Sequence, residues 1–237
     1  MYLTIIDTET TGLDTSTCSV VEVGAILYSV KHQKIINQMS FLMPLNNTGE
    51  DAFEIHGIES SLCQLSIGFM PLKEVLDEWV EVSSYVVSHN VEFDSALIDG
   101  IPEEKWLCTF RDFRWPKSRS RELIKIALAY DIPVTTVHRA LADCSLIASL
   151  FTKLGDKLTY SIEEAIKPLH FVVIDSPKYL TKDQCYPYNL SFGDIQITYG
   201  GTPRILKKWH GWLRQEEIDN LPEYLSQHLI IGRSIRH

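Results

Sequence analysis

The 237-residue sequence contains no apolar run close to the roughly 18–20 residues that a bilayer-spanning helix requires. Its first apolar run ends in acids and follows no basic leader, so we expect neither a signal peptide nor a membrane partner. The five cysteines are scattered, odd in number and without metal-type spacing, which fits reduced thiols in a cytoplasmic protein. With 45% apolar and 22% charged residues, the composition predicts an ordinary globular protein.

The sequence also lacks an excess of positive charge. Its net charge of −9 argues against a protein that coats nucleic acid nonspecifically, because such binding depends on Lys and Arg neutralising phosphates. The charge is uneven: residues 170–237 hold 8 basic and 7 acidic side chains, which leaves 14 and 24 for residues 1–169. Acidity in the front part suits either cation binding or solubility, and its sign alone does not separate the two.

The composition changes near residue 168. From there on, prolines and glycines divide the chain into short segments, such as HFVVID (170–175) and DIQITY (194–199), and one acidic helix is expected over 214–221. We therefore expect two domains, an α/β domain over 1–165 and a small α+β accessory module over 166–237.

Apolar periodicity gives the expected elements of the front domain. β-branched runs predict strands over the following ranges: 2–8, 19–30, 34–43 and, shorter, 85–90. Helical spacing of apolar residues predicts helices over these ranges: 72–82, 91–98, 122–130 and 139–154. Three strands followed by helices that alternate with short strands indicate a mixed α/β sheet.

The stretch IIDTETTGLD (5–14) places two acids at the end of the first expected strand. Asp7 and Glu9 are two residues apart, so both carboxylates project from one face if the strand runs through residue 9. Like charges held that close need a proton or a cation between them. The alternative at this point is a strand end with two solvated acids.

Three further acids and one histidine are candidates by position. Asp94 follows a short buried strand and falls in the first turn of an expected helix. The helix dipole favours acids at that position, which is the simpler explanation for Asp94. Asp143 lies among apolar residues of an expected core helix and needs a partner. Glu22 has the same problem unless it faces solvent. His138 converges with Asp143 only from a loop before that helix, and is otherwise a capping or surface histidine.

Together these residues match a known pattern. The segments DTETTGL (7–13), HNVEFD (89–94) and HRALAD (138–143) resemble the three motifs of the DnaQ-like (DEDDh) 3′–5′ exonucleases. The segment WLCTFRDFRWP (106–116) is similar to bacterial exonuclease X-type members. The resemblance covers about residues 1–155. It implies an RNase H-like fold, a five-stranded mixed sheet flanked by helices.

The resemblance also implies a metal-dependent site. Four carboxylates form an all-oxygen ligand set, which suits two Mg²⁺ or Mn²⁺ ions. By analogy with the family, Asp7 bridges both ions, Glu9 and Asp143 complete the first site, and Asp94 holds the second. His138 is then the general base, a role that imidazole side chains commonly fill at neutral pH.

Substrate contacts are also implied. Thr10, Gly12 and Leu13 resemble the segment that holds the terminal nucleotide, and His56 and Phe93 resemble an apolar shelf under the last bases. For these residues the alternative is ordinary core or loop packing. Asn90 belongs to the second motif and joins this predicted substrate-binding set.

Two basic segments have two interpretations each. RDFRWPKSRSR (111–121) fits either a phosphate-tracking loop or a solvated one. RILKKWHGWLR (204–214) interleaves basic residues with Trp209 and Trp212, which suits nucleic-acid contact. The two tryptophans equally suit the core of a very small domain.

The resemblance thus implies a metal-dependent 3′–5′ exonuclease that removes nucleoside 5′-monophosphates from the 3′ end of nucleic acid, with DNA as the expected substrate. The alternatives are a 3′–5′ exoribonuclease of RNase T or oligoribonuclease type, and a noncatalytic subunit that docks a polymerase or binds nucleic acid. Since the chain contains no polymerase, proofreading would need a polymerase or repair partner.

Overall fold

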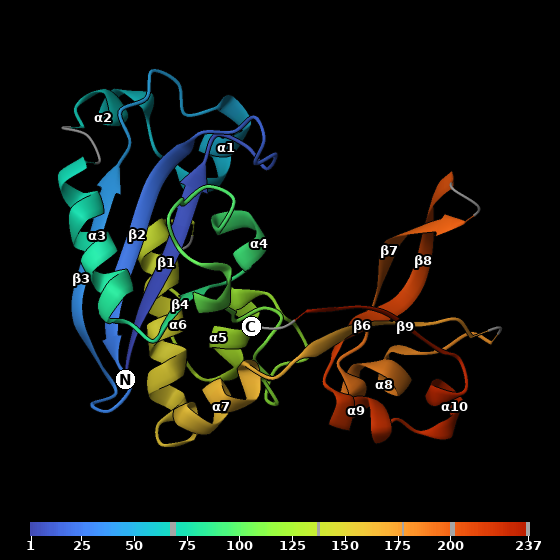
Figure 1. Cartoon of the computed structure of the whole chain (residues 1–237). Helices are drawn as coiled ribbons and strands as arrows, with labels where there is room; N and C mark the ends of the chain where they lie inside the picture. Colours follow the sequence, from blue (N-terminus) through green and yellow to red (C-terminus); the bar gives the residue numbers. More distant parts are fainter. Residues whose placement is uncertain (67–69, 137, 177, 200–201, 236–237) are drawn as a thin grey trace. The chain divides into compact units, whose positions relative to one another are not determined.

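The computed structural model describes residues 1–66, 70–136, 138–176, 178–199 and 202–235 (Figure 1). The chain divides into two compact units, Met1–Ala165 and Ile166–His237. In the ranges described, no helix is both long enough and apolar enough to span a membrane. All five cysteines are free, and all except Cys18 are buried.

The first unit is built on a five-stranded mixed sheet. Its strands are β1 (Tyr2–Thr10), β2 (Val20–Ser29), β3 (Lys34–Leu42), β4 (Tyr85–Ser88) and β5 (Trp106–Cys108). They lie in the order β3-β2-β1-β4-β5. The three long strands pair antiparallel, whereas β4 and β5 run parallel to β1. The expected mixed sheet is therefore confirmed.

Helices cover both faces of this sheet. They are α1 (Glu50–His56), α2 (Ser60–Gln64), α3 (Met70–Val82), α4 (Val91–Asp94), the 3₁₀ turn η1 (Glu103–Lys105), α5 (Leu123–Ala129), α6 (Ala140–Leu154) and α7 (Lys157–Ala165). Helix α3 lies across one face and α6 against the other (Figure 1). The expected helix over 91–98 is regular only to Asp94. Turns then follow, in which the Ile98 N–H still donates to the Asp94 carbonyl at 3.0 Å.

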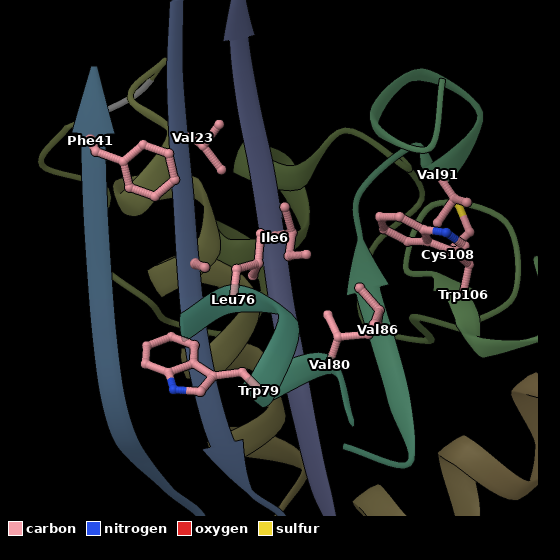
Figure 2. Close-up of a cluster of buried hydrophobic side chains, with 11 residues drawn as sticks. Ile6, Val23, Phe41, Leu76, Trp79, Val80, Val86, Val91, Trp106 and Cys108 are labelled. Carbon is pink, nitrogen blue, oxygen red and sulfur yellow. The ribbon is translucent and has the colours of Figure 1, made fainter. Parts of the chain in front are cut away.

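The apolar side chains of α3 form the core on its face of the sheet. Leu76, Trp79 and Val80 share one buried cluster with Ile6 of β1 and Val86 of β4; Leu76 lies beside Ile6 and Val80 beside Val86 (Figure 2). Because Ile6 points toward α3, alternation along β1 directs Ile5 and Asp7 toward the α6 face. Burial of the α3 core therefore fixes the face on which the motif acids appear.

The second unit contains a four-stranded antiparallel sheet in the order β7-β8-β6-β9. Its elements are β6 (Leu169–Ile174), α8 (Lys182–Cys185), the 3₁₀ turn η2 (Tyr186–Tyr188), β7 (Ser191–Tyr199), β8 (Thr202–Leu213), α9 (Gln215–Asp219), α10 (Glu223–Ser226) and β9 (Leu229–Ile235). A core that includes Trp209, Ile218 and Leu225 joins one face of the sheet to the helices. The unit thus has a core of its own.

Candidate active site

Strand β1 carries the first two motif acids on one face of the sheet. It runs through Thr10, so Asp7 and Glu9 are both strand residues and project from the same side. Across the antiparallel pair, Asp7 lies opposite Gly24 and Glu9 lies opposite Glu22. Both acids are half-buried. They are therefore not the fully solvated acids of a strand end.

Helix α6 brings the third acid to the same face, and Gly24 makes this approach possible. A Cβ at Gly24 would lie 2.4 Å from the backbone carbon of Ala140 and 2.4 Å from the nitrogen of Leu141. Only a residue without a side chain lets the first turn of α6 rest directly on β2 at this point. Asp143, in that first turn, thereby reaches the acids of β1.

Three carboxylates meet at this junction. Oxygens of Asp7, Glu9 and Asp143 lie within 4.8 Å of one another. The Oδ1 atom of Asp143 is buried and has no hydrogen-bond partner among the residues described. A buried acceptor without a donor is costly, and a bound cation would satisfy it. The geometry thus fits a metal site held by oxygen ligands.

The pKa shifts in this cluster have one common physical origin. Burial, and then the charges of Asp94 and Asp143, raise the pKa of Asp7 well above its usual range. Burial and the Asp143 charge raise the pKa of Glu9 to about 8. Burial raises the pKa of Asp143 to about 6, against a lowering by His138. Without a cation, the cluster therefore holds protons in the neutral range.

Asp94 lies beside this cluster but is held differently. It is 3% exposed, and its carboxylate accepts hydrogen bonds from the hydroxyls of Thr8, at 2.8 Å, and Ser88. Burial raises its pKa to about 6, although the bonds from Ser88 and Thr8 lower it. Its charge is the largest electrostatic influence on Asp7. The charge of Asp94 thus influences the three acids, although Asp94 is not among the carboxylates whose oxygens lie within 4.8 Å of one another.

Sequence reasoning did not identify the role of Glu22. This side chain is 1% exposed and does not face solvent. It accepts hydrogen bonds from Arg139 Nε at 2.9 Å, the Ala140 backbone N–H at 3.0 Å and Ser40 Oγ at 2.7 Å. Burial alone would raise the pKa of Glu22, but these hydrogen bonds lower it below its usual value. Glu22 therefore ties the start of α6 to the sheet.

His138 lies on the loop that leads into this helix. Helix α6 begins at Ala140, so His138 precedes it by two residues, the arrangement that convergence with Asp143 requires. Its backbone is left-handed, with φ of 55°, and its imidazole is exposed. A positive φ is uncommon for a residue with a side chain. The loop thus holds the imidazole next to Asp143, whose pKa it lowers.

The loop after β1 carries the first group of predicted substrate contacts. Thr10 is buried, and its hydroxyl donates to the Gly12 carbonyl at 2.6 Å, which closes a tight turn. Apart from its chain neighbours, no described residue has an atom within 4 Å of the position where a Cβ of Gly12 would stand, and Leu13 is 86% exposed. An apolar side chain this exposed, beside open backbone, is available for contact with a ligand.

The other predicted contacts come from α1 and α4. His56 is buried, its Nδ1 accepts from the Ile58 N–H at 3.0 Å, and its Nε2 has no partner among the residues described. Phe93 is half-buried in α4. Asn90 precedes α4 with φ of 98°. The residue that sequence reasoning missed here is Gly49, also at positive φ, where a Cβ would lie 2.5 Å from the Thr11 carbonyl oxygen.

The basic segment 111–121 is partly structural. Arg111 pairs with Asp112 at 2.6 Å and Glu92 at 2.8 Å, with only 11% of its side chain exposed. Phe113 and Trp115 stack on each other in the core. The buried aromatics and the internal ion pairs limit how much of this segment can follow a phosphate backbone.

Comparison with known proteins agrees with this geometry. The sequence profile of an exonuclease family, the RNase T type, matches residues 4–151. The chain belongs to this exonuclease family. The match contains all three motifs, so the predicted family is confirmed, and with it the assignment to a class of metal-dependent exonucleases.

Individual relatives are more distant. The chain is 26% identical over 235 residues to the PolC-type DNA polymerase III of Thermotoga maritima, a match that covers 86% of this chain and 16% of the relative. It is 28% identical over 169 residues to the DNA polymerase III subunit epsilon of Aquifex aeolicus, covering 66% and 81%. The chain thus spans less than a fifth of the PolC-type relative's length.

Among solved structures, exonuclease X in complex with 5′ overhanging duplex DNA is similar to this chain. The TM-score is 0.54 at 27% identity, and the match covers 69% of this chain and 99% of that one. The same mixed sheet flanked by helices is present in both. This similarity confirms the predicted RNase H-like fold.

Proposed function

We propose that this protein is a 3′→5′ exonuclease that hydrolyses phosphodiester bonds at the 3′ end of DNA and releases nucleoside 5′-monophosphates. The observation that carries the proposal is the convergence of Asp7, Glu9 and Asp143 from two elements far apart in sequence. Their raised pKa values and the unpartnered Oδ1 of Asp143 support a cation as the missing partner.

In this proposal Asp7, Glu9 and Asp143 hold divalent cations, Mg²⁺ or Mn²⁺, with Asp94 contributing to a second position. When bound, two such ions would supply a more acidic water and stabilise negative charge on the leaving oxygen. Thr8 and Ser88 orient the Asp94 carboxylate by hydrogen bonds. Glu22 is already paired with Arg139, so it is reserved for positioning and takes no part in holding cations.

His138 is proposed as the general base. The exposed imidazole accepts the proton of the attacking water as a bond forms between the water oxygen and phosphorus. The bond between phosphorus and the 3′ oxygen of the preceding nucleotide breaks, and that oxygen takes up a proton from solvent. An imidazole is suited to this step near neutral pH. The loop geometry before α6 keeps it beside Asp143.

The terminal nucleotide is proposed to lie against the loop after β1. The open backbone at Gly12 leaves room for a close approach, and the exposed Leu13 offers an apolar contact. His56, whose buried Nε2 has no hydrogen-bond partner among the residues described, is proposed to support the predicted apolar shelf from below, and Phe93 to pack against a base. Asn90, at the start of α4, and Thr10, which closes the β1 turn, complete this proposed set.

DNA is proposed over RNA because the relatives that match most of this chain are named as DNA polymerase III proteins. A polymerase or a repair assembly is the corresponding partner. A noncatalytic subunit is disfavoured because the four motif acids and the motif histidine are all present.

The test is digestion of end-labelled DNA and RNA, each single- and double-stranded, with Mg²⁺, with Mn²⁺ and with EDTA. We expect stepwise shortening from the 3′ end of DNA, release of 5′-monophosphates, and no reaction in EDTA. Full activity in EDTA would rule out a catalytic metal at the cluster. Faster digestion of RNA than of DNA would identify RNA as the preferred substrate.

A further inference from the structure

The sheet of the second unit presents two different faces. On one face, Trp209 of β8 packs with Val172 and Ile174 of β6 in the core shared with the helices, and its Nε1 donates to the Leu180 carbonyl at 3.2 Å. Side chains alternate along a strand, so Phe171 and Trp212, which pair across β6 and β8, lie on the other face.

Aromatic rings adjoin one another on this second face. The ring of Phe171 is 5.3 Å from that of Trp212 and 5.7 Å from that of His210, measured between centroids. The guanidinium of Arg233, on β9, lies 5.3 Å from the centroid of Trp212. The three rings are half-buried, so part of each remains accessible. We refer to Phe171, His210, Trp212 and Arg233 as the aromatic sheet face.

Basic side chains outnumber acids on this face of the sheet. Alternation along β8 places Arg204 and Lys208 on the same side as Trp212. In the four strands as described, Asp194 is the one acid. It lies across from Lys207 in the β7–β8 register, and both residues are on the face opposite to Trp212. Most other acids of the unit belong to its helices: Asp183, Glu216, Glu217, Asp219 and Glu223. Near this face, Asp175 pairs with Lys208.

We propose that the aromatic sheet face binds single-stranded nucleic acid, with bases stacked on Phe171, His210 and Trp212 and phosphates near Arg233 and Arg204. Stacking on aromatic rings accepts every base, which suits a strand that is shortened one nucleotide at a time. Cations without neighbouring strand carboxylates complement phosphates. The proposal rests on the proposed function in taking nucleic acid as the ligand, but it concerns a surface outside the carboxylate cluster.

Binding of the full-length chain in EDTA tests this proposal independently of cleavage. Fluorescence anisotropy would compare a labelled dT20 strand with a strand of equal length made of abasic sites. We expect the wild type to prefer dT20, and Trp212→Leu to bind dT20 on the order of tenfold more weakly and lose that preference. Tyr179→Leu is the matched control, since Tyr179 is 90% exposed in the same unit and outside the sheet.

Arg233 gives a second readout that does not involve the tryptophan. Arg233→Ala should reduce the slope of log affinity against log salt by roughly 0.7, the value for one lost phosphate contact on a single strand. Lys182→Ala removes an exposed charge from α8, on the covered side of the unit, and should leave the slope unchanged. Trp212→Phe keeps an aromatic ring and should retain most of the affinity, even if Trp212→Leu fails to fold.

The proposal is overturned if Trp212→Leu and Arg233→Ala bind dT20 with wild-type affinity and salt slope. It is also overturned if the wild type binds no strand in EDTA, an outcome that would favour a protein partner for this face. Failure of the proposed function is a separate result. If the wild type binds dT20 but cleaves nothing with Mg²⁺ or Mn²⁺, the proposed nuclease activity is wrong, and the binding of the variants still tests the aromatic sheet face.

Discussion

Glu9 and Glu22 lie opposite each other on β1 and β2, yet their surroundings shift their pKa values in opposite directions. Glu22 accepts hydrogen bonds from Arg139 and from the Ala140 N–H, and its pKa is lowered. Glu9 faces Asp143 instead, and with burial this raises its pKa to about 8. Arg139 pairs directly with Glu22, whereas its effect on the pKa of Glu9 is outweighed by burial and by the Asp143 charge.

This contrast separates positioning from chemistry. An acid that is neutralised by the protein itself has a structural role, and here it anchors the helix that carries Asp143. An acid left with like charges around it costs stability in the metal-free protein and creates affinity for an external cation.

The first prediction concerns the acids without an internal cation. Asp7→Asn and Asp143→Asn should each lower turnover by several orders of magnitude, because each removes a proposed cation ligand. The same changes remove repulsion, so the melting temperature of the metal-free protein should stay the same or rise. Asp77→Asn, which changes an exposed acid on α3 paired with Lys73, should alter neither quantity. A cluster variant that cleaves at the wild-type rate would contradict the proposal.

The second prediction concerns His138 on the loop that Glu22 helps to position. Removing a general base costs about 10²–10⁴-fold, so His138→Ala should lose that much in kcat with little change in metal affinity. Rates over pH 6–9 and a metal titration would test this. His32→Ala, at an exposed turn residue, serves as the control. Equal rates for His138→Ala and the wild type across this range would remove His138 from the chemistry.

The third prediction addresses the acid with the internal cation. Glu22→Gln should weaken the anchor of α6 and lower metal affinity or turnover by about 10–100-fold, the usual effect of outer ligand-orienting groups. The unfolding free energy should fall by about 1–3 kcal/mol, because buried donors lose a charged acceptor. If Glu22 acts through Arg139, Arg139→Gln added to Glu22→Gln should cost little more. Fully additive effects would contradict this coupling.

The fourth prediction is the pH dependence of metal stabilisation. The folded-state pKa values of Glu9, Asp94 and Asp143 are raised above their usual values near 4, to about 8, 6 and 6. The metal-free protein should therefore lose stability as pH rises from about 4 to 8, since the folded state binds more protons than the unfolded state. Metal binding displaces those protons.

The increase in melting temperature caused by Mg²⁺ or Mn²⁺ should accordingly be larger at pH 8.5 than at pH 5.5. Differential scanning fluorimetry at both pH values, with EDTA as the reference, would measure it. Asp7→Asn should show a smaller increase at the higher pH. A metal effect that is independent of pH would contradict the raised pKa values of the cluster.

Much of the first unit followed from local sequence patterns. β-branched alternation located β1, β2 and β3 to within two residues at each end, and helical spacing located α3 and α6. These patterns are informative because burial on one face imposes a period of 2 or 3.6 on the chain itself. Helix α7, although nine residues long, was not predicted.

The two tryptophans of 204–214 show where the sequence left a choice open. Core packing and nucleic-acid contact both suited Trp209 and Trp212. The pairing of β8 with β6 places the two side chains on opposite faces of the sheet. Trp209 lies in the core, and Trp212 lies beside Phe171 on the other face. Alternation predicts that residues 209 and 212 point to opposite sides, but only the packed helices show which side is covered.

The motif acids, their order, the histidine before α6 and the family of the chain are all readable from the sequence. The direct pairing of Glu22 with Arg139 depends on folding, because Arg139 lies 117 residues from Glu22 in the chain. Folding also assigned Gly24 its place beneath α6. Local patterns fix which face a side chain occupies, whereas its charge environment depends on partners that folding brings from elsewhere in the chain.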